Sequence, residues 1–471
     1  MSTHCGYIVQ VNNLRPHPNA DRLQIATFFG NDTCVSLDIV KGEIGIYFPS
    51  DLQLSEEFCE INHLCRKKKD GTPDTGYLDE NKRNVRAIKL RGEKSDGIFM
   101  PLSSLAYTGI NMDDLNVGDR IDVLNGHEIC KKYIPRTNNR TGKPSDGNKT
   151  RKKKVPTAPL FAEHADTEQL AYNLGVFKPG DEIEITLKMH GTSQRTGHLP
   201  VLKGYKDSFG CRAGNAIRHI LNKMGAYHGE DYHDGEPIYD WGYVSGTRRT
   251  VLENFDGGYY GSNEFREDHS KFFEGKLWKG ETVYYEVVGF THTGAPIMAT
   301  ADNKKMNDKD FIKQYGKETV FSYGCHPNGW NSKTGGYNSG RNEPQSDIYV
   351  YRMTMTNADG DVVEYTPDFM RYRCEQMGAK TVPVMWKGTI EGKRIECGEI
   401  TPGDWIKNIA EGYYDGPDPI GKTHTREGVV VRILNRPKFC AYKHKNFAFK
   451  VLEGIIKDTA TEPDMEEVQD A

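Results

Sequence analysis

Lys188 is the residue of this sequence best placed to act as a covalent nucleophile. It ends the segment Glu182–Lys188, in which isoleucine and leucine alternate with polar residues, the period of a β-strand with one buried face. Gly191 follows closely and permits a tight turn at the end of the strand. A lysine held in this way can attack an electrophile once its amine is neutral. Because a lysine three residues before a glycine is common, the prediction depends on partners elsewhere in the chain.

Two carboxylates stand in or beside apolar strands further along the sequence. Glu286 lies inside Thr282–Phe290, a stretch rich in β-branched and aromatic residues, and Glu427 opens the apolar stretch Glu427–Leu434. A carboxylate is normally excluded from such surroundings unless it pairs with a cation or a metal. Carboxylate oxygens are hard ligands that suit Mg²⁺ or Mn²⁺. We therefore predict that Glu286 and Glu427 hold a divalent metal.

Three cations could neutralise a polyphosphate near these carboxylates. Lys443 and Lys445 fall on one face of Ala441–Lys450, which we expect to be a single strand. Two neighbouring lysines repel each other unless an anion lies between them. Arg248 has a guanidinium that can bind two phosphate oxygens at once. With Lys188 and the two carboxylates, these cations predict a site that handles phosphates.

In this order the residues resemble the motifs of the covalent nucleotidyltransferase superfamily, which contains RNA ligases, DNA ligases and mRNA capping enzymes. The matching segments are Lys188–Gly191 (motif I), Ser245–Arg249 (motif Ia), Tyr285–Gly289 (motif III), Asp347–Met353 (motif IIIa), Glu427–Arg432 (motif IV) and Tyr442–Lys445 (motif V). The sequence Lys-Met-His-Gly-Thr-Ser at 188–193 is similar to motif I of the RNA ligase family typified by the Deinococcus enzyme. The resemblance covers residues 155–455.

The resemblance implies an α+β fold, with an N-terminal OB-type β-barrel followed by a nucleotidyltransferase core of antiparallel sheets with flanking helices. It also implies an ATP-dependent RNA ligase that uses Mg²⁺ or Mn²⁺, joins a 3′-OH to a 5′-phosphate through lysyl-AMP, and acts on RNA or an RNA-containing duplex in RNA repair. The residues implied to bind the nucleotide are Lys188, Gly191, Arg248, Glu286, Lys443 and Lys445, and those implied to bind the metal are Glu286 and Glu427.

Several assignments stay open. Arg212 is an alternative to Arg248, and either Tyr349 or Tyr351 could stack on the purine. A DNA ligase and a capping guanylyltransferase share the core motifs, although the capping family carries its OB domain after motif V. Here about 20 residues follow Lys450, too few for a domain. An RNA-binding protein with a decayed core is the alternative that is not an enzyme.

Residues 1–130 are expected to form the OB-fold domain, a nucleic-acid clamp outside the catalytic set. Its predicted strands are Tyr7–Val11, Gln24–Phe29, Cys34–Ile39, Ile44–Tyr47, Arg86–Leu90 and Gly97–Met100. Residues 131–154 are a basic linker, and 155–455 are the nucleotidyltransferase domain, with an irregular insertion near 200–243 that contains a helix at 214–224. Residues 456–471 form an acidic tail.

Composition fits a cytoplasmic enzyme, or one of the host cytoplasm if the gene is viral. The ten cysteines are scattered without a Cys-x-x-Cys pair, which argues against a zinc site and fits a reducing compartment. No stretch has the apolar length of a signal peptide or a membrane span. The net charge is only −4, so any basic RNA-binding surface must be local.

One motif must be set aside. Gly416–Thr423 matches the Gly-x-x-x-x-Gly-Lys-Thr pattern of a phosphate-binding loop. That loop needs a strand before it and a helix after it, so that backbone amides face the phosphates. Here Pro417 and Pro419 remove amide donors, and an apolar strand follows. We predict a turn that leads into a strand.

Overall fold

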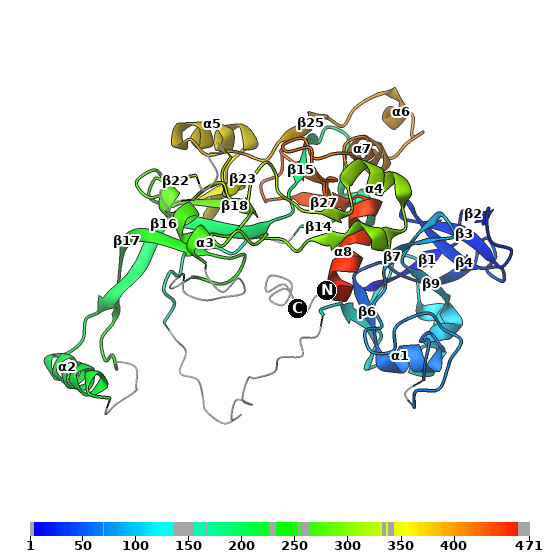
Figure 1. Cartoon of the computed structure of the whole chain (residues 1–471), viewed down its shortest axis with the longest axis horizontal. Coiled ribbons are helices and arrows are strands. Elements are labelled where there is room, and N and C mark those ends of the chain that lie inside the picture. Colours follow the sequence, from blue (N-terminus) through cyan, green and yellow to red (C-terminus); the bar gives the residue numbers. More distant parts are fainter. Residues whose placement is uncertain are drawn as a thin grey trace.

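The computed structural model describes residues 4–68, 70–135, 155–164, 167–225, 232–252, 255, 263–331, 336–337 and 343–459. Over these residues the chain forms a mixed α+β fold of several mainly antiparallel sheets with flanking helices (Figure 1). The α+β class predicted from the sequence is therefore confirmed. None of the helices in the described ranges is long and apolar enough to cross a membrane.

The predicted nucleophile lies in a five-stranded sheet that we call the lysine sheet. Its strands, in spatial order, are β14 (Glu168–Gln169), β27 (Ala441–Lys445), β26 (Gly428–Ile433), β15 (Glu182–Lys188) and β25 (Val384–Thr389). The apolar residues of β15 are buried, as the period of two predicts. In the register of the sheet, Lys188 pairs with Gly428, which in turn pairs with Lys445. The ends of three strands thus bring the motif I and motif V lysines to the same edge.

A second five-stranded sheet, the hairpin sheet, carries Glu286. Its strands are β17 (Pro237–Gly246), β16 (Thr192–Tyr205), β18 (Glu281–Gly289), β23 (Ser346–Thr356) and β24 (Val362–Glu364). The turn after Lys188 leads directly into β16, where Ser193 pairs with Glu286. A Cβ on Gly191 would lie 2.4 Å from the Val287 carbonyl oxygen, so only glycine allows this close approach.

Helices cover the two sheets and close their cores. They are α3 (Glu264–Phe272), α4 (Lys309–Tyr315), α5 (Pro367–Met377), α6 (Lys393–Glu396), α7 (Pro402–Glu411) and α8 (Phe447–Thr459). Thr366 and Thr401 accept hydrogen bonds from the first turns of α5 and α7, and each is followed by a proline at the start of its helix. Helix α5 packs on the hairpin sheet around Met370 and Cys374, and α7 packs on the lysine sheet around Ile406.

The N-terminal unit consists of several small sheets. One sheet has the order β10-β1-β5-β9 and another the order β2-β3-β4, with two-stranded sheets beside them. The bounds are β1 (Gly6–Gln10), β2 (Leu14–Pro16), β3 (Leu23–Phe28), β4 (Asn31–Ser36), β5 (Ile44–Phe48), β6 (Leu52–Leu54), α1 (Glu56–Ile61), β7 (Ala87–Leu90), β8 (Glu93–Asp96), β9 (Ile98–Pro101), β10 (Arg120–Ile121), β11 (Val123–Leu124), β12 (His127–Glu128) and β13 (Cys130–Lys132). Each of the six predicted strands overlaps an observed one, although the predicted Cys34–Ile39 strand is displaced to Asn31–Ser36. No closed barrel is found in the described part of the chain, so the OB fold stays a prediction.

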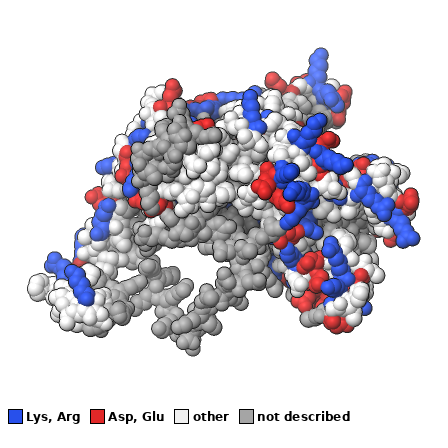
Figure 2. All heavy atoms as spheres, viewed as in Figure 1, with Lys and Arg blue, Asp and Glu red and all other residues white. Residues whose placement is uncertain are grey.

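The insertion near 200–243 is more regular than expected. Strands β16 and β17 pair along their length from Arg195–Gly246 to Tyr205–Pro237. They form an arm that ends in helix α2 (Phe209–Lys223), which begins earlier than the predicted 214–224 helix (Figure 1). The prediction of irregular structure rested on the glycine and aspartate content of this region. It is wrong because some of these residues lie within the paired strands β16 and β17. Figure 2 shows basic side chains on α2 at the tip of the arm.

The predicted strand Ala441–Lys450 is wrong beyond Lys445. Strand β27 ends there, and α8 runs from Phe447 to Thr459. Asn446 starts the helix, because its side-chain oxygen accepts a hydrogen bond from the Phe449 amide at 2.7 Å. Alternating apolar residues can fit either period over so short a stretch. Helix α8 therefore extends through Thr459 into the start of the predicted tail, whereas 460–471 of the tail and 136–154 of the linker lie outside the described residues.

The flanks of Gly416–Thr423 are those of a turn. Helix α7 precedes the segment, and strand β26 follows it. Asp418 accepts hydrogen bonds from the amides of Gly421 and Lys422, so these donors are used within the turn. A phosphate loop would need the opposite order of strand and helix. The observed order, helix α7 before the segment and strand β26 after it, agrees with the prediction of a turn in place of a phosphate-binding loop.

Candidate active site

Lys188 and Glu427 form the central contact of the site. The Lys188 Nζ atom lies 2.9 Å from the Glu427 Oε1 atom, and the Glu427 side chain is only 2% exposed. The contact follows from the sheet register, because β26 begins directly after Glu427 and its first residue pairs with Lys188. A buried carboxylate requires such a cationic partner. The pair therefore holds the Lys188 amine at the end of β15, at the edge of the lysine sheet.

The turn after Lys188 is fixed by two hydrogen bonds from its backbone. The Gly191 amide donates to Glu286 Oε1 at 3.1 Å, and the His190 amide donates to the Tyr323 hydroxyl at 2.8 Å. The His190 ring lies edge-on to Phe321 and to Phe449, which belongs to α8. Burial lowers the pKa of His190 to about 4, so its imidazole is neutral at physiological pH. It adds no positive charge to the site.

The motif V lysines differ in their surroundings. Lys445 contacts both oxygens of Glu453 at 2.9 and 2.8 Å and lies 3.7 Å from Glu427. Burial opposes its charge, but these two carboxylates raise the pKa of Lys445 above its ordinary value. Burial lowers the pKa of Lys443 to about 8, helped by the charges of Lys445, Lys188 and Arg248. Lys443 is thus a buried amine surrounded by other cations, as expected where an anion binds.

The structure brings the predicted residues together. One cavity is lined by six of them, and Glu427 joins the set through its contact with Lys188. The six are Lys188, Gly191, Arg248, Glu286, Lys443 and Lys445. Arg212, the alternative to Arg248, lies on α2 at the end of the arm. Of the two tyrosines considered for purine stacking, Tyr349 packs in the same core as Met189, and Tyr351 shares a hydrogen bond with Ser193.

The acidic residues fit a divalent metal. The Glu427 Oε2 atom is buried and has no hydrogen-bond partner among the described residues. Such an atom costs free energy unless a ligand satisfies it. Glu286 lines the cavity from the opposite sheet. The carboxylate oxygens of Glu286 and Glu427 are hard donors of the kind that suits Mg²⁺ or Mn²⁺.

Sequence reasoning missed part of the cavity wall. The N-terminal unit contributes His4, Asp51, Arg120 and Lys132, and α8 contributes Lys450, Glu453 and Lys457. Glu453 and Lys457 have the i,i+4 spacing of a helical ion pair, a signal that was hidden by reading 441–450 as a strand. Nothing local in the sequence indicates that the N-terminal residues reach this site.

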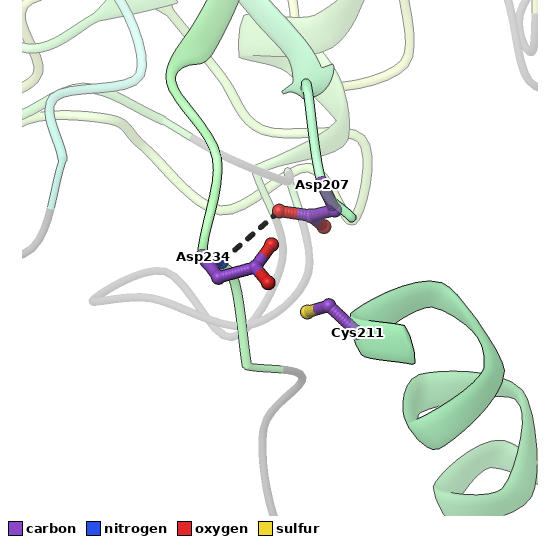
Figure 3. A group of neighbouring side chains, drawn as sticks. All are labelled: Asp207, Cys211 and Asp234. Carbon is purple, nitrogen blue, oxygen red and sulfur yellow. Dashed lines mark hydrogen bonds between the residues drawn. The ribbon is translucent and has the colours of Figure 1, made fainter. Parts of the chain in front are cut away.

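A separate group of candidate metal ligands lies at the base of α2. Asp207, Cys211 and Asp234 have ligand atoms within 4.8 Å of one another (Figure 3). Each already serves local structure. Asp207 accepts from His233 at 2.7 Å, Cys211 donates to the Tyr232 carbonyl, and Asp234 accepts from the Ser208 hydroxyl at 2.6 Å. These bonds hold α2 on the arm, and we assign no metal to the group.

Comparison with known proteins gives a shared fold. Structures of Naegleria gruberi RNA ligase align with 95% of this chain at 14% identity. A lysine-to-alanine mutant with ATP and Mn covers 95% of this chain and 98% of its own, with a TM-score of 0.50. A glutamate-to-alanine mutant with ATP and Mn gives a TM-score of 0.51, and a structure with PPi gives 0.50. No protein-family model and no curated protein matches the sequence.

The charge of Lys443 should cost stability in the nucleotide-free protein. Its pKa falls from 10.5 to about 8 on folding, so the folded state holds this proton less tightly than the unfolded state. We expect Lys443→Met to raise the thermal unfolding midpoint at neutral pH. The advantage should shrink as pH rises from about 8 to 10.5, where the native lysine loses its proton.

Thermal unfolding of both proteins across that pH range measures the effect. Lys422→Met is the matched control, because Lys422 is exposed in the turn before β26. A Lys443→Met protein that is less stable at neutral pH, or whose advantage ignores pH, would contradict this electrostatic account.

Proposed function

We propose that this protein is an ATP-dependent RNA ligase that joins a 3′-OH to a 5′-phosphate through lysyl-AMP. One observation carries the proposal. A lysine amine contacts a buried carboxylate at 2.9 Å, and the cavity that this lysine lines is also lined by Lys443, Lys445, Arg248 and Glu286. This arrangement suits a nucleophile that attacks a polyphosphate. The fold shared with an RNA ligase supports the same reaction.

In the first step the Lys188 amine attacks the α-phosphate of ATP. A phosphorus–nitrogen bond forms, the bond to the leaving pyrophosphate breaks, and the amine loses a proton. Glu427 is the carboxylate in contact with this amine and can accept its proton or hold it in place before attack. Lys443, Lys445 and Arg248 face the same cavity and would neutralise the charge that develops on the phosphate oxygens.

Glu286 and Glu427 would hold the divalent cation, for which the unsatisfied Glu427 Oε2 atom is the strongest support. A bound Mg²⁺ or Mn²⁺ would supply Lewis acidity at the phosphate oxygens. The Naegleria ligase structures with ATP and Mn support this choice of nucleotide and ion.

Two transfers complete the reaction. The 5′-phosphate of an RNA end attacks the lysyl-AMP, so the phosphorus–nitrogen bond breaks and a pyrophosphate linkage forms. The 3′-OH of the other end then attacks the 5′-phosphate, a phosphodiester forms, and AMP leaves. The RNA substrate, a role in RNA repair in the cytoplasm, and OB-type binding of RNA by the N-terminal unit belong to this proposal. The narrower relation to the Deinococcus type rests on the Lys-x-His-Gly-Thr-Ser sequence at 188–193.

Labelled nucleotides test the first step. With [α-³²P]ATP the protein should acquire a covalent label, and with [α-³²P]GTP it should not. Lys188→Arg should abolish the label, because arginine stays protonated and cannot form the phosphoramidate. Label from GTP would indicate a capping enzyme instead. A Lys188→Arg protein that still takes up AMP would refute the assignment of the nucleophile.

Substitutions of the two carboxylates should affect the sealing rate more than a substitution in the turn at Gly416–Thr423. Glu286→Gln and Glu427→Gln should each lower the sealing rate of a nicked RNA duplex by about 10² or more, because each removes charge that stabilises the transition state. Lys422→Ala should change the rate little. If Lys422→Ala were as damaging as Glu427→Gln, the turn would be part of the phosphate site after all.

A further inference from the structure

A continuous series of charges links the nucleophile to the N-terminal unit. It starts with Lys188 and Glu427 at 2.9 Å, continues from Glu427 to Lys445 at 3.7 Å, and then from Lys445 to Glu453 at 2.8 Å. Glu453 lies on α8 and its side chain is only 12% exposed. Opposite charges alternate without interruption along this path. Each member therefore depends on the next to hold its position.

The series ends on Asp51. The Lys457 Nζ atom lies 3.4 Å from Glu453 and 3.1 Å from Asp51 Oδ1. Lys457 is one turn further along α8 than Glu453, so it receives a carboxylate from its own helix and another from the N-terminal unit. With a side chain only 9% exposed, Lys457 is little screened by water.

Asp51 is held rigidly by its backbone. Its amide donates to the Val85 carbonyl, and its carbonyl accepts from the Tyr133 amide at 2.9 Å. Its φ of 76° lies in the left-handed region, which costs free energy for a residue with a Cβ and persists where the surroundings impose it. The carboxylate is thus presented to Lys457 from a fixed point between β5 and β6.

We propose that Asp51 is a positioning residue for AMP attachment. Through Lys457 and Glu453 it holds Lys445 in the cavity, so that the N-terminal unit takes part in the first chemical step. Without the Asp51 charge, Lys457 is no longer fixed between two carboxylates, so the Glu453 side chain that it contacts is no longer held in place. Lys445 then loses its two-point contact and shifts relative to the phosphate. This inference rests on the proposed ligase function.

The N-terminal unit would then act in AMP attachment as well as in the binding of nucleic acid. From the sequence, residues 1–130 are a clamp for nucleic acid outside the catalytic set. In the structure, Asp51 and other residues of that unit line the cavity that contains Lys188. Other ion pairs also join the units, including Lys89 with Asp308 and Lys450 with Asp96. Lys89 and Asp308 do not line the cavity that contains Lys188. A variant that removes this pair therefore shows whether a weaker attachment of the two units is enough to slow the reaction.

The experiment measures single-turnover AMP attachment by the full-length protein over a range of ATP concentrations. We expect Asp51→Asn and Lys457→Met each to lower the rate at saturating ATP by about tenfold to a hundredfold, the scale of a small misplacement of a catalytic group. The ATP concentration at half-maximal rate should change little, because the loss is in the transition state. Asp51→Glu should restore part of the rate. Lys89→Met, which removes an ion pair of the same kind, should not slow the reaction.

A double-mutant cycle identifies the route. If Asp51 acts through Lys445, Asp51→Asn should cause little further loss in a Lys445→Ala protein. Multiplicative losses would overturn the proposal, as would a normal rate for both Asp51→Asn and Lys457→Met. Equal losses for Lys89→Met would also overturn it, because they would indicate a general weakening between the units. If the unmodified protein took up no AMP, the ligase function itself would fail, whereas labelled wild type with unaffected variants would overturn the positioning role alone.

Discussion

The buried carboxylate of Glu427 is the interaction on which the site depends. It lies at the start of β26, where water is nearly excluded, and a charge there is tolerated only with cationic partners. Lys188 and Lys445 supply them from the two strands that flank β26. The register of three strands thus sets the position of the nucleophile. A shift of one residue would turn these side chains to the opposite face of the sheet.

Around this carboxylate the positive charges are only partly balanced. Lys445 is well paired, since Glu453 and Glu427 both contact it. Lys443 is not, and its lowered pKa records the repulsion and burial that it experiences. A polyphosphate entering the cavity would relieve this imbalance, which would give binding energy at the place where the chemistry needs negative charge to be neutralised. The charge of Lys443 is thus expected to lower the stability of the protein in the absence of an anion, a cost that is common at functional sites.

Several residues of the proposed site could be predicted because they lie in or beside strands with clear patterns. The alternation of apolar and polar residues in β15 identified Lys188 at the end of that strand. Glu286 was identified because it is a carboxylate within an apolar strand. The start of α8 could not be predicted in the same way, because the alternation that ends β27 continues into the first turn of the helix. Glu453 lay beyond the predicted strand and Lys457 fell in the predicted acidic tail, so neither residue was singled out. Asp51 is 406 positions away from Lys457 in the sequence, and no local pattern reports a contact over such a distance.

The central claim is that the Lys188 amine forms the bond to AMP. Lys443 is the rival amine, because it lines the same cavity and its pKa of about 8 leaves more of it neutral near physiological pH than an ordinary lysine. The most direct measurement is to incubate the protein with ATP and Mn²⁺, digest it under conditions that preserve the phosphoramidate, and locate the AMP by tandem mass spectrometry. The account predicts AMP on the peptide that contains Lys188. AMP on the peptide that contains Lys443, with Lys188 unmodified, would contradict it.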